Sequence, residues 1–307
     1  MTETVKISGQ TVGLSRLDKV LYPDAGLTKG DVIDYYRSIA ETMLPHLTDR
    51  PLTMHRFPDG IEADGFYQKE APDYFPGWIR RVSVHVEEED GEQEQITCES
   101  AATLVYLANQ ACLTPHIWLS RAGQLHHPDK LIFDLDPPDG DFEPVRQTAL
   151  DLRELLQEVG LVPYVMTTGS RGMHVVVPLD RSTEFDRVRT FARDLAEVLA
   201  RRKPDQLTVK QRKKKRKGRL FLDYLRNSYG QTSVAPYSLR PLPGAPVATP
   251  LDWSEAHDRD LRSQSYTIDN IFRRMGQKED PWQDFLQDTR TLDESRQMLD
   301  ELLEEGN

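Results

Sequence analysis

Cysteine is scarce in this chain, and long apolar runs are missing. The 307 residues include 2 cysteines, Cys98 and Cys112, whose spacing fits no disulfide framework. The longest apolar runs, such as His174–Leu179 and Leu131–Leu135, have the length of a strand, well short of the roughly 18 residues that a membrane helix needs. We therefore expect buried thiols in a reducing compartment, and no association with a membrane.

The first residues, Met1-Thr-Glu-Thr-Val5, also lack the basic and then apolar pattern of a secretion signal. Charged residues make up 29% of the chain and aromatic residues 8%, which is the composition of a folded, soluble protein. A chain of 307 residues can form one large domain or two intimate lobes around a hydrophobic core. These features predict a globular, cytoplasmic protein.

Charge of one sign is concentrated in a few places. The net charge is −11, which would argue against a nucleic-acid partner if it were spread evenly. Lys210–Arg219, however, is almost entirely basic, whereas acidic residues gather in Glu87–Glu94 and in the last part of the chain, from Asp280 to Glu305. Because a polyanion responds to the local field rather than to the total charge, Lys210–Arg219 is a candidate contact for nucleic acid.

Alternating periodicities predict an α/β or α+β fold with a central mixed or antiparallel sheet flanked by helices. Thr28 suits a helix N-cap and Asp31 the reciprocal capping position, so a helix is predicted from there to about Leu47. Further helices are predicted over Ser100–Leu113, Pro144–Val159, Thr183–Arg201 and around Ile268–Met275 and Thr291–Glu304. Strands are predicted over Lys130–Asp136, Val162–Thr167, His174–Leu179 and Arg219–Leu225, with short strands and turns in residues 1–25 and 50–90 and an extended segment over Pro236–Pro250.

Carboxylates interrupt two of the apolar strands. Asp134 and Asp136 stand two residues apart, so a strand projects them from the same face, and the prolines that follow end the strand there. Two such carboxylates raise each other's pKa unless a cation lies between them, and hard oxygen ligands suit Mg²⁺ or Mn²⁺. Asp223 interrupts another apolar strand. If the strands are neighbours, the three carboxylates would form a two-metal site for phosphoryl transfer.

Other functions fit the same aspartates. An isolated Asp-x-Asp is often a turn with two solvated carboxylates, and metal-dependent phosphatases and nucleases use similar clusters. The haloacid dehalogenase phosphatases expect Thr or Val two residues after the second aspartate, where this chain has Pro138. A catalytically silent DNA-end adaptor is a further alternative, although a chain that keeps all three aspartates argues against it.

Donors suited to a triphosphate gather in the glycine turn Gly169–Gly172. Ser170 and Arg171 lie in the turn and His174 follows it, although an ordinary hairpin would contain similar residues. Further candidates for nucleotide binding are Arg56, His116 and Arg240. A lone histidine is more often structural, and a lone arginine is more often a surface charge.

In this order, the motifs resemble the polymerase domain of bacterial ligase D, the end-joining polymerase of the archaeo-eukaryotic primase superfamily. The resemblance covers roughly residues 10 to 295 and implies a primase-like fold. It implies one catalytic domain over 1–307, with 1–50 as an N-terminal DNA-end-binding element and 250–307 as a C-terminal helical wrap. The segments that carry it are Leu17-Asp-Lys-Val-Leu-Tyr-Pro23, Thr28-Lys-Gly-Asp-Val-Ile-Asp-Tyr-Tyr36, Arg50-Pro-Leu-Thr53, Gly65-Phe-Tyr-Gln-Lys69, Phe133-Asp-Leu-Asp-Pro137, Gly169-Ser-Arg-Gly172 and Ala235-Pro-Tyr-Ser-Leu-Arg240.

The resemblance implies a template-dependent nucleotidyltransferase that fills gaps and extends DNA ends in non-homologous end joining, using ribo- and deoxyribonucleotides. Two Mn²⁺ or Mg²⁺ ions would be held by Asp134, Asp136 and Asp223. The implied partners are nucleoside triphosphates, DNA with 5′-phosphorylated ends or gaps, Ku and a DNA ligase, in the cytoplasm at the nucleoid. The implied nucleotide contacts are Arg56, His116, Ser170, Arg171, His174 and Arg240.

The resemblance also implies contacts with DNA. Lys19 and Lys29 match a pocket for a 5′-phosphate, and the predicted helix start at Lys29 would favour an anion. Phe66 and Tyr67 match aromatic residues that lie against DNA, and Arg216 matches an arginine of a mobile loop. The ordinary alternatives are a solvated surface charge for each lysine and core packing for the aromatic pair.

The chain departs from the family pattern at three positions. Arg171 stands where lysine is common, Arg226 where glutamine is frequent, and His55 where a basic residue often contacts nucleotide. No ligase or nuclease motif is recognisable, so we expect either a stand-alone polymerase or a domain excised from a longer protein.

Overall fold

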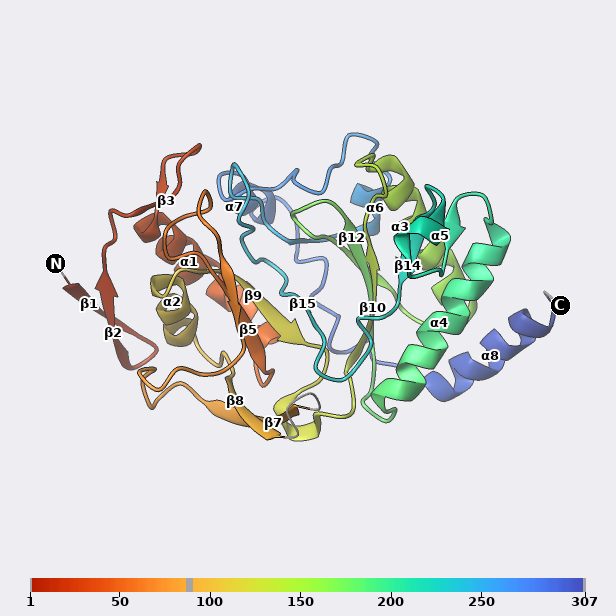
Figure 1. Cartoon of the computed structure of the whole chain (residues 1–307), viewed down its shortest axis with the longest axis horizontal. Helices are drawn as coiled ribbons and strands as arrows, with labels where there is room; N and C mark the ends of the chain where they lie inside the picture. The colour runs from red at the N-terminus through yellow and green to blue at the C-terminus, as the bar shows by residue number, and fades with distance from the viewer. Residues whose placement is uncertain (1, 87–90, 306–307) are drawn as a thin grey trace. The chain divides into compact units, whose positions relative to one another are not determined.

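The computed structural model describes residues 2–86 and 91–305 of the chain, which forms two compact units built from interleaved segments (Figure 1). The first unit contains Met1–Gly123, Thr232–Ala248 and Tyr266–Ile271, and the second contains Gln124–Gln231, Thr249–Ser265 and Phe272–Asn307. Of the acidic segment predicted at Glu87–Glu94, residues 87–90 lie outside the described part.

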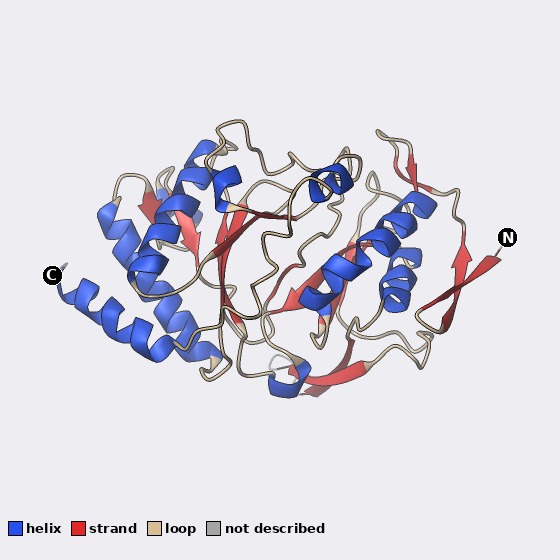
Figure 2. Cartoon of the chain, turned by 180° about the vertical axis from the view of Figure 1, so that it is seen from behind, coloured by secondary structure: helices blue, strands red, loops and turns tan. Residues whose placement is uncertain are grey.

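The first unit is a sheet of antiparallel strands with a pair of helices against it. The strand order is β15-β9-β5-β8-β7, with β6 paired to β5. Helix α1 packs on α2, and helices are drawn in blue in Figure 2. Its elements are β1 (Thr2–Ile7), β2 (Gln10–Ser15), β3 (Val20–Tyr22), β4 (Leu27–Thr28), α1 (Lys29–Leu47), β5 (Leu52–Arg56), β6 (Phe66–Gln68), β7 (Arg81–Val86), β8 (Gly91–Ile96), α2 (Ala101–Asn109), β9 (Cys112–Trp118) and β15 (Thr232–Val234).

The start of α1 follows the capping chemistry that its sequence predicts. The side chain of Thr28 accepts a hydrogen bond from the backbone of Asp31, and the Asp31 side chain accepts one from the backbone of Thr28. The apolar stripe of α1 is buried, including Ile39 and Met43 at 0% exposure. The helix therefore holds its first residue, Lys29, in a fixed place.

The second unit is built on a six-stranded sheet in the order β13-β14-β10-β12-β11-β16, antiparallel except for the β13–β14 pair. Helices α3 and α4 pack against its central strands, and α8 lies along α4 (Figure 1). Its elements are β10 (Lys130–Leu135), α3 (Glu143–Glu158), β11 (Tyr164–Thr167), β12 (Met173–Pro178), α4 (Phe185–Arg202), β13 (Leu207–Thr208), α5 (Lys213–Arg216), β14 (Leu220–Asp223), β16 (Thr249–Leu251), α6 (Trp253–Ala256) and α8 (Leu292–Glu305). Two short helices, η1 (Ala122–Gln124) and α7 (Ile271–Met275), lie at junctions between the two units' segments.

The expected fold class is confirmed, and most predicted elements are present within a few residues of their expected bounds. One boundary was wrong: the helix predicted over Ser100–Leu113 ends at Asn109, and β9 follows from Cys112. The chain reverses at Ala111, which has a left-handed φ of 57°. Strand β15 was not predicted. Both cysteines are buried free thiols, as expected.

Among the described helices, none combines the length and the apolar character that crossing a membrane requires.

An asparagine replaces a missing strand partner beside β10. Strand β14 pairs with β10 at Asp134↔Asp223 and Leu135↔Leu222 and then ends. Beyond this point the side chain of Asn227, which is 0% exposed, supplies the hydrogen bonds to β10. Its Oδ1 accepts the Ile132 N–H at 2.8 Å, and its Nδ2 donates to the Ile132 carbonyl at 2.7 Å. The side chain thus continues the ladder and fixes the strand that carries Asp134.

We predict that Asn227→Ala lowers the free energy of unfolding by about 2–4 kcal/mol, because it leaves a buried N–H and a buried carbonyl without partners. Urea denaturation monitored by circular dichroism measures this change. Gln147→Ala, which removes an exposed amide from α3, is the control and should have almost no effect. Equal stability of the two variants would contradict the role given to Asn227.

Candidate active site

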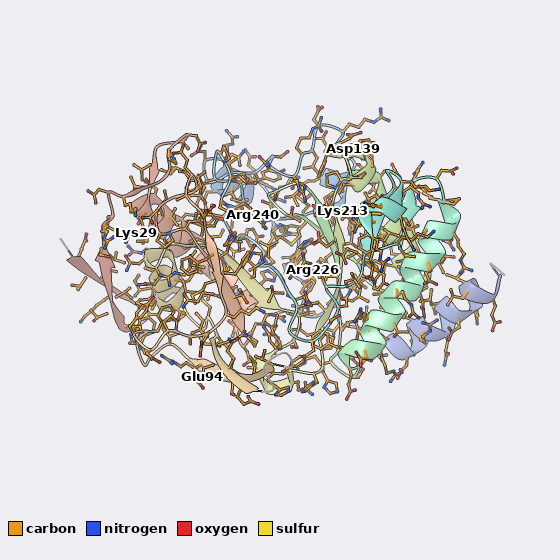
Figure 3. The ribbon with its side chains drawn as sticks, in the orientation of Figure 1. Lys29, Glu94, Asp139, Lys213, Arg226 and Arg240 are labelled. Atoms are coloured by element: carbon orange, nitrogen blue, oxygen red, sulfur yellow. The ribbon has the colours of Figure 1, made fainter. Side chains whose placement is uncertain are left out.

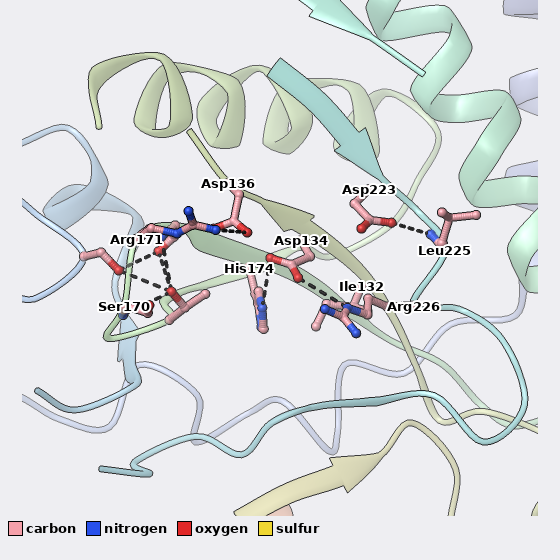
Figure 4. Close-up of polar contacts among 12 residues, drawn as sticks. Ile132, Asp134, Asp136, Ser170, Arg171, His174, Asp223, Leu225 and Arg226 are labelled. Atoms are coloured by element: carbon pink, nitrogen blue, oxygen red, sulfur yellow. Dashed lines mark hydrogen bonds and ion pairs between the residues drawn. The ribbon is translucent and has the colours of Figure 1, made fainter. Parts of the chain in front are cut away.

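A row of polar side chains crosses three neighbouring strands of the second unit. Asp134 on β10 lies opposite His174 on β12 and opposite Asp223 on β14. Residues directly opposite in antiparallel strands share a face, about 5 Å apart. Asp136 follows two residues after Asp134, so the three carboxylates gather at one end of the sheet (Figure 4). The structure thus brings together the aspartates that the sequence analysis selected separately.

Asp134 is the central carboxylate of this row. Its Oδ1 lies 3.4 Å from Nε2 of His174, and its Oδ2 lies 3.4 Å from Nε of Arg226 (Figure 4). Burial alone would raise the pKa of Asp134, but His174 and Arg226 outweigh it and hold the pKa at about 2. Asp134 is therefore ionised at neutral pH.

The pKa of each of the other two carboxylates, Asp136 and Asp223, is raised rather than lowered. Burial and the neighbouring charge of Asp134 raise the pKa of Asp136, which Arg171 contacts at 3.4 Å. Burial also raises the pKa of Asp223, although its Oδ1 accepts the Leu225 N–H at 2.8 Å. Their charged forms are disfavoured in this arrangement, and a nearby cation would stabilise them.

The donor set fits a hard divalent cation. Three carboxylates at adjoining strand ends supply the oxygen ligands that Mg²⁺ and Mn²⁺ prefer. Within residues 2–86 and 91–305, no group of three or more His, Cys, Asp or Glu side chains is arranged so that it could hold a metal ion. At the row itself, Asp134 faces His174 and Arg226, and Asp136 faces Arg171. A cation bound to these carboxylates would compete with the exposed guanidinium groups of Arg171 and Arg226.

The glycine turn after β11 is tied closely to the carboxylates. Oγ1 of Thr168 accepts hydrogen bonds from the N–H groups of Ser170 and Gly172, at 3.3 and 3.2 Å. A Cβ on Gly172 would lie 2.0 Å from the carbonyl oxygen of Leu135 and 2.9 Å from Oδ1 of Asp136. Only glycine allows this approach, which places Ser170 and Arg171 beside the end of β10.

His174 contributes a buried nitrogen to the same place. The residue is 4% exposed, and among the described residues its Nδ1 has no hydrogen-bond partner. A buried polar atom without a partner is costly, and a bound molecule could satisfy it. Because Nε2 faces Asp134, Nδ1 is the atom left for a substrate group.

In the first unit, β5, β6 and β9 assemble a cluster of rings. His55 stacks on Tyr67 at 4.0 Å, and the rings of Tyr67 and His116 lie 5.4 Å apart. Burial, together with the charge of Arg240, lowers the pKa of His55 to about 4. His55 is therefore neutral at physiological pH, and its ring can serve as a flat, uncharged stacking surface next to Arg240.

Arg56 and Phe66 lie on the opposite face of these strands. Arg56 donates to Gln68 Oε1 at 2.7 Å and to the Gln110 carbonyl at 2.9 Å, and it lies 5.5 Å from the Phe66 ring centroid. Strand alternation separates Phe66 from Tyr67 in the same way. The structure therefore does not bring Arg56 to His116, nor does it place the two predicted DNA-contacting rings side by side.

The two lysines of the predicted phosphate pocket have different environments. Lys29, labelled in Figure 3, is 5% exposed. Its Nζ lies 3.3 Å from the Asn109 carbonyl oxygen and 3.4 Å from Oγ of Ser15, and no described carboxylate pairs with it. Burial, with Arg16 and Lys19 nearby, lowers its pKa. Lys19 instead pairs with Asp59 at 2.6 Å.

The basic loop, residues 210–219, contains the short helix α5, on which Figure 3 labels Lys213. The guanidinium of Arg216 donates to the Gln211 carbonyl at 2.8 Å and lies 4.2 Å from the Phe221 ring centroid. Arg216 is thus folded onto its own loop. The lysines around it are exposed.

Several residues that shape these sites were not predicted. Ser15 and Asn109 hold Lys29, Asp59 pairs with Lys19, and Asn227 fixes β10. No local pattern marks these residues because each acts across a long sequence separation. Arg226 was noted only as a departure from a family pattern, without its contact to Asp134.

Comparison with known proteins decides the family. The family model of the LigD primase-polymerase domain matches residues 28–282. This chain belongs to that family. The predicted resemblance is confirmed, and so is the enzyme class, a nucleotidyltransferase-type DNA polymerase.

Individual relatives agree with this family. The multifunctional non-homologous end joining DNA repair protein LigD of Mycobacterium tuberculosis (strain H37Rv) is 36% identical over 282 residues, which cover 89% of this chain and 37% of that protein. The bifunctional non-homologous end joining protein LigD of Bacillus subtilis is 32% identical over 271 residues, covering 88% of this chain and 43% of that protein. The chain therefore spans less than half the length of these two LigD proteins.

A solved structure confirms the predicted fold. The polymerase domain of Mycobacterium tuberculosis ligase D in complex with DNA superposes with a TM-score of 0.84 at 32% identity, covering 90% of this chain and 98% of that chain. The primase-like architecture predicted for this LigD-family chain is thus shared by a solved polymerase domain.

We predict that Gly172→Ala lowers the rate of primer extension about 100-fold, because the added Cβ would push the end of β10 and displace Asp136 from its position. The measurement is single-turnover extension of a labelled primer. Gly77→Ala is a matched control, since its Cβ would meet nothing within 4 Å. Wild-type rates in Gly172→Ala would show that the close approach does not position the carboxylate.

Proposed function

We propose that the protein is a template-dependent polymerase that fills gaps and extends DNA ends in non-homologous end joining. The observation that carries this proposal is the placement of Asp134, Asp136 and Asp223 at adjoining strand ends in a chain of the LigD primase-polymerase family. The relatives named for end joining and the DNA-bound neighbour support the same conclusion.

Residues of the second unit are proposed either to hold the metal ions or to bind the triphosphate. Two Mn²⁺ or Mg²⁺ ions held by Asp134, Asp136 and Asp223 would lower the pKa of a primer 3′-hydroxyl and neutralise triphosphate charge. Arg171, which is exposed beside Asp136, would pair with triphosphate oxygens. Nδ1 of His174 and the hydroxyl of Ser170 would orient the same group.

The first unit supplies further proposed contacts. His116 and Arg240 are proposed to bind nucleotide, with the neutral ring of His55 beside them. Arg56 is a weaker candidate, because Gln68, Gln110 and Tyr74 already hold its guanidinium.

We predict that Asp134→Asn, Asp136→Asn and Asp223→Asn each reduce extension by about 1,000-fold or more, because an amide neither carries the charge nor ligates the cation well. DNA-end binding, measured separately by fluorescence anisotropy, should stay within about threefold of wild type. A labelled primer with nucleoside triphosphates distinguishes extension from the shortening that a nuclease would cause. Full extension by the Asp134 and Asp136 variants would refute the assignment.

We also propose that Lys19 and Lys29 recognise a 5′-phosphate. Lys29 is a buried ammonium beside a helix N-terminus, without a carboxylate partner among the described residues, so a dianionic terminal phosphate would complete its environment. Asp59 competes with the phosphate for Lys19. Phe66 or Tyr67, both exposed, would lie against DNA bases.

We predict that Lys29→Met reduces the preference for phosphorylated over unphosphorylated DNA ends roughly ten- to a hundred-fold, since a charge-assisted contact contributes about 1.5–3 kcal/mol. Asp59→Asn should increase the preference, because it frees Lys19. Binding titrations at fixed salt measure both effects. Neutralising several lysines of the basic loop is the control, and it should weaken the binding of phosphorylated and unphosphorylated ends alike. If the wild-type protein bound phosphorylated and unphosphorylated ends equally, the proposed phosphate pocket would be refuted.

The remaining proposals concern Arg216 of the basic loop, the choice of nucleotide sugar and the protein partners. Arg216 would turn toward the active site when DNA binds, which requires release of its contacts to Gln211 and Phe221. We propose that ribonucleotides are incorporated at least as well as deoxyribonucleotides. Ku and a DNA ligase are the proposed protein partners, at the nucleoid in the cytoplasm. Competition between the two nucleotide types at equal concentration tests the sugar preference.

A further inference from the structure

Arg226 brings an exposed guanidinium to the central carboxylate of the site. Its Nε lies 3.4 Å from Oδ2 of Asp134, and the two side chains are 44% and 15% exposed. The other oxygen, Oδ1, faces Nε2 of His174, whose side chain is 6% exposed. A divalent ion that ligates Asp134 through Oδ2, at about 2.1 Å, would compete with the Arg226 guanidinium for that oxygen.

Arg226 is the residue that can leave. Its contact is a single one at 3.4 Å, longer and weaker than a two-pronged arginine–carboxylate pair. The next residue, Asn227, is fully buried and bonded to Ile132, so the backbone beside Arg226 is anchored while its side chain reaches solvent. His174, by contrast, is enclosed within β12.

We propose that Arg226 is an internal counter-cation that takes the place of a divalent ion at Asp134, is displaced when the ion binds, and thereby sets the metal concentration at which the site fills. This inference rests on the proposed function, because it assumes that the three aspartates bind metal. The displaced guanidinium, still close to Asp134 and Asp223, can then pair with an anionic group of the bound nucleotide.

The charges predict opposite effects of removing Arg226 in the two states. Without metal, the guanidinium of Arg226 offsets negative charge at Asp134, as that of Arg171 does at Asp136. Loss of Arg226 leaves more repulsion, so the metal-free protein should be less stable. The same loss removes a competitor for Asp134, so metal should bind more tightly. A residue that only supports packing would not strengthen metal binding.

Titration of the protein with Mn²⁺ alone, followed by the electron paramagnetic resonance signal of free Mn²⁺, tests the proposal. We expect Arg226→Gln to lower the Kd of the site about tenfold, or about 1.4 kcal/mol. Arg226→Lys keeps the charge and should stay within about twofold of wild type. Arg187→Gln, which breaks a 3.3 Å pair with Asp293 between side chains 69% and 70% exposed, is the matched control and should change nothing.

Thermal unfolding supplies the second readout and shows whether each variant folds. The metal-free Arg226→Gln protein should melt about 2 °C below wild type, and saturating Mn²⁺ should remove that difference. An unchanged or weaker Mn²⁺ affinity in Arg226→Gln would overturn the counter-cation role. Asp134→Asn separates this outcome from failure of the proposed function: if it binds Mn²⁺ like wild type, the metal assignment itself is wrong.

Discussion

Burial and mutual repulsion act together on three carboxylates of the second unit. Asp134, Asp136 and Asp223 project from the ends of β10 and β14, where burial and the charge of Asp134 raise the pKa of Asp136 and of Asp223. The surrounding structure opposes their separation. Asn227 completes the hydrogen bonding of β10, and Gly172 lets the turn after β11 close against Leu135. These contacts hold the strand ends in place, so a cation would offset the repulsion without moving them.

In the structure, two guanidinium groups and one histidine, which is charged only if protonated, face these carboxylates. His174 and Arg226 face Asp134, and Arg171 faces Asp136. The two arginine contacts are long and partly exposed, so they stabilise a carboxylate modestly and can be exchanged for a divalent ion or for a substrate. A polymerase site needs this property, because metal and nucleotide must enter and pyrophosphate must leave. The second unit thus holds its carboxylates rigidly and its counter-charges loosely.

The proposed anion-binding site of the first unit is built differently from the carboxylate site of the second unit. Lys29 is held rigidly at the start of α1 by a capping box, and its ammonium is buried against neutral oxygens. Its partner in the proposed pocket, Lys19, is already paired with Asp59. Recognition of a terminal phosphate would therefore combine one preformed positive charge with one that must be released from a competitor.

Sequence reasoning reached the aspartates because strand alternation is local: Asp134 and Asp136 stand two residues apart, and Asp223 interrupts an apolar run. It could not establish that Asp223 lies opposite Asp134, because strand register across 89 residues is set by tertiary packing. The contact of Arg226 with Asp134 was missed for the same reason.

Other features of the site were within reach of the sequence. Alternation alone would have placed Phe66 and Tyr67 on opposite faces of a strand, as the structure does. The end of α2 at Asn109 was harder, since only the left-handed turn at Ala111 separates a helix from a strand with equally apolar residues. The capping box of α1, by contrast, was predicted to the residue because its chemistry is confined to one turn.

The central claim is that these three carboxylates bind the catalytic ions. The most direct test is a crystal of the protein grown with Mn²⁺ and a non-hydrolysable nucleoside triphosphate, analysed by the anomalous scattering of manganese. We expect a peak between Asp134 and Asp136, with Asp223 at or beside it and with Arg226 moved away from Asp134. A fully occupied nucleotide with no manganese peak at these aspartates, or with manganese bound elsewhere, would contradict it.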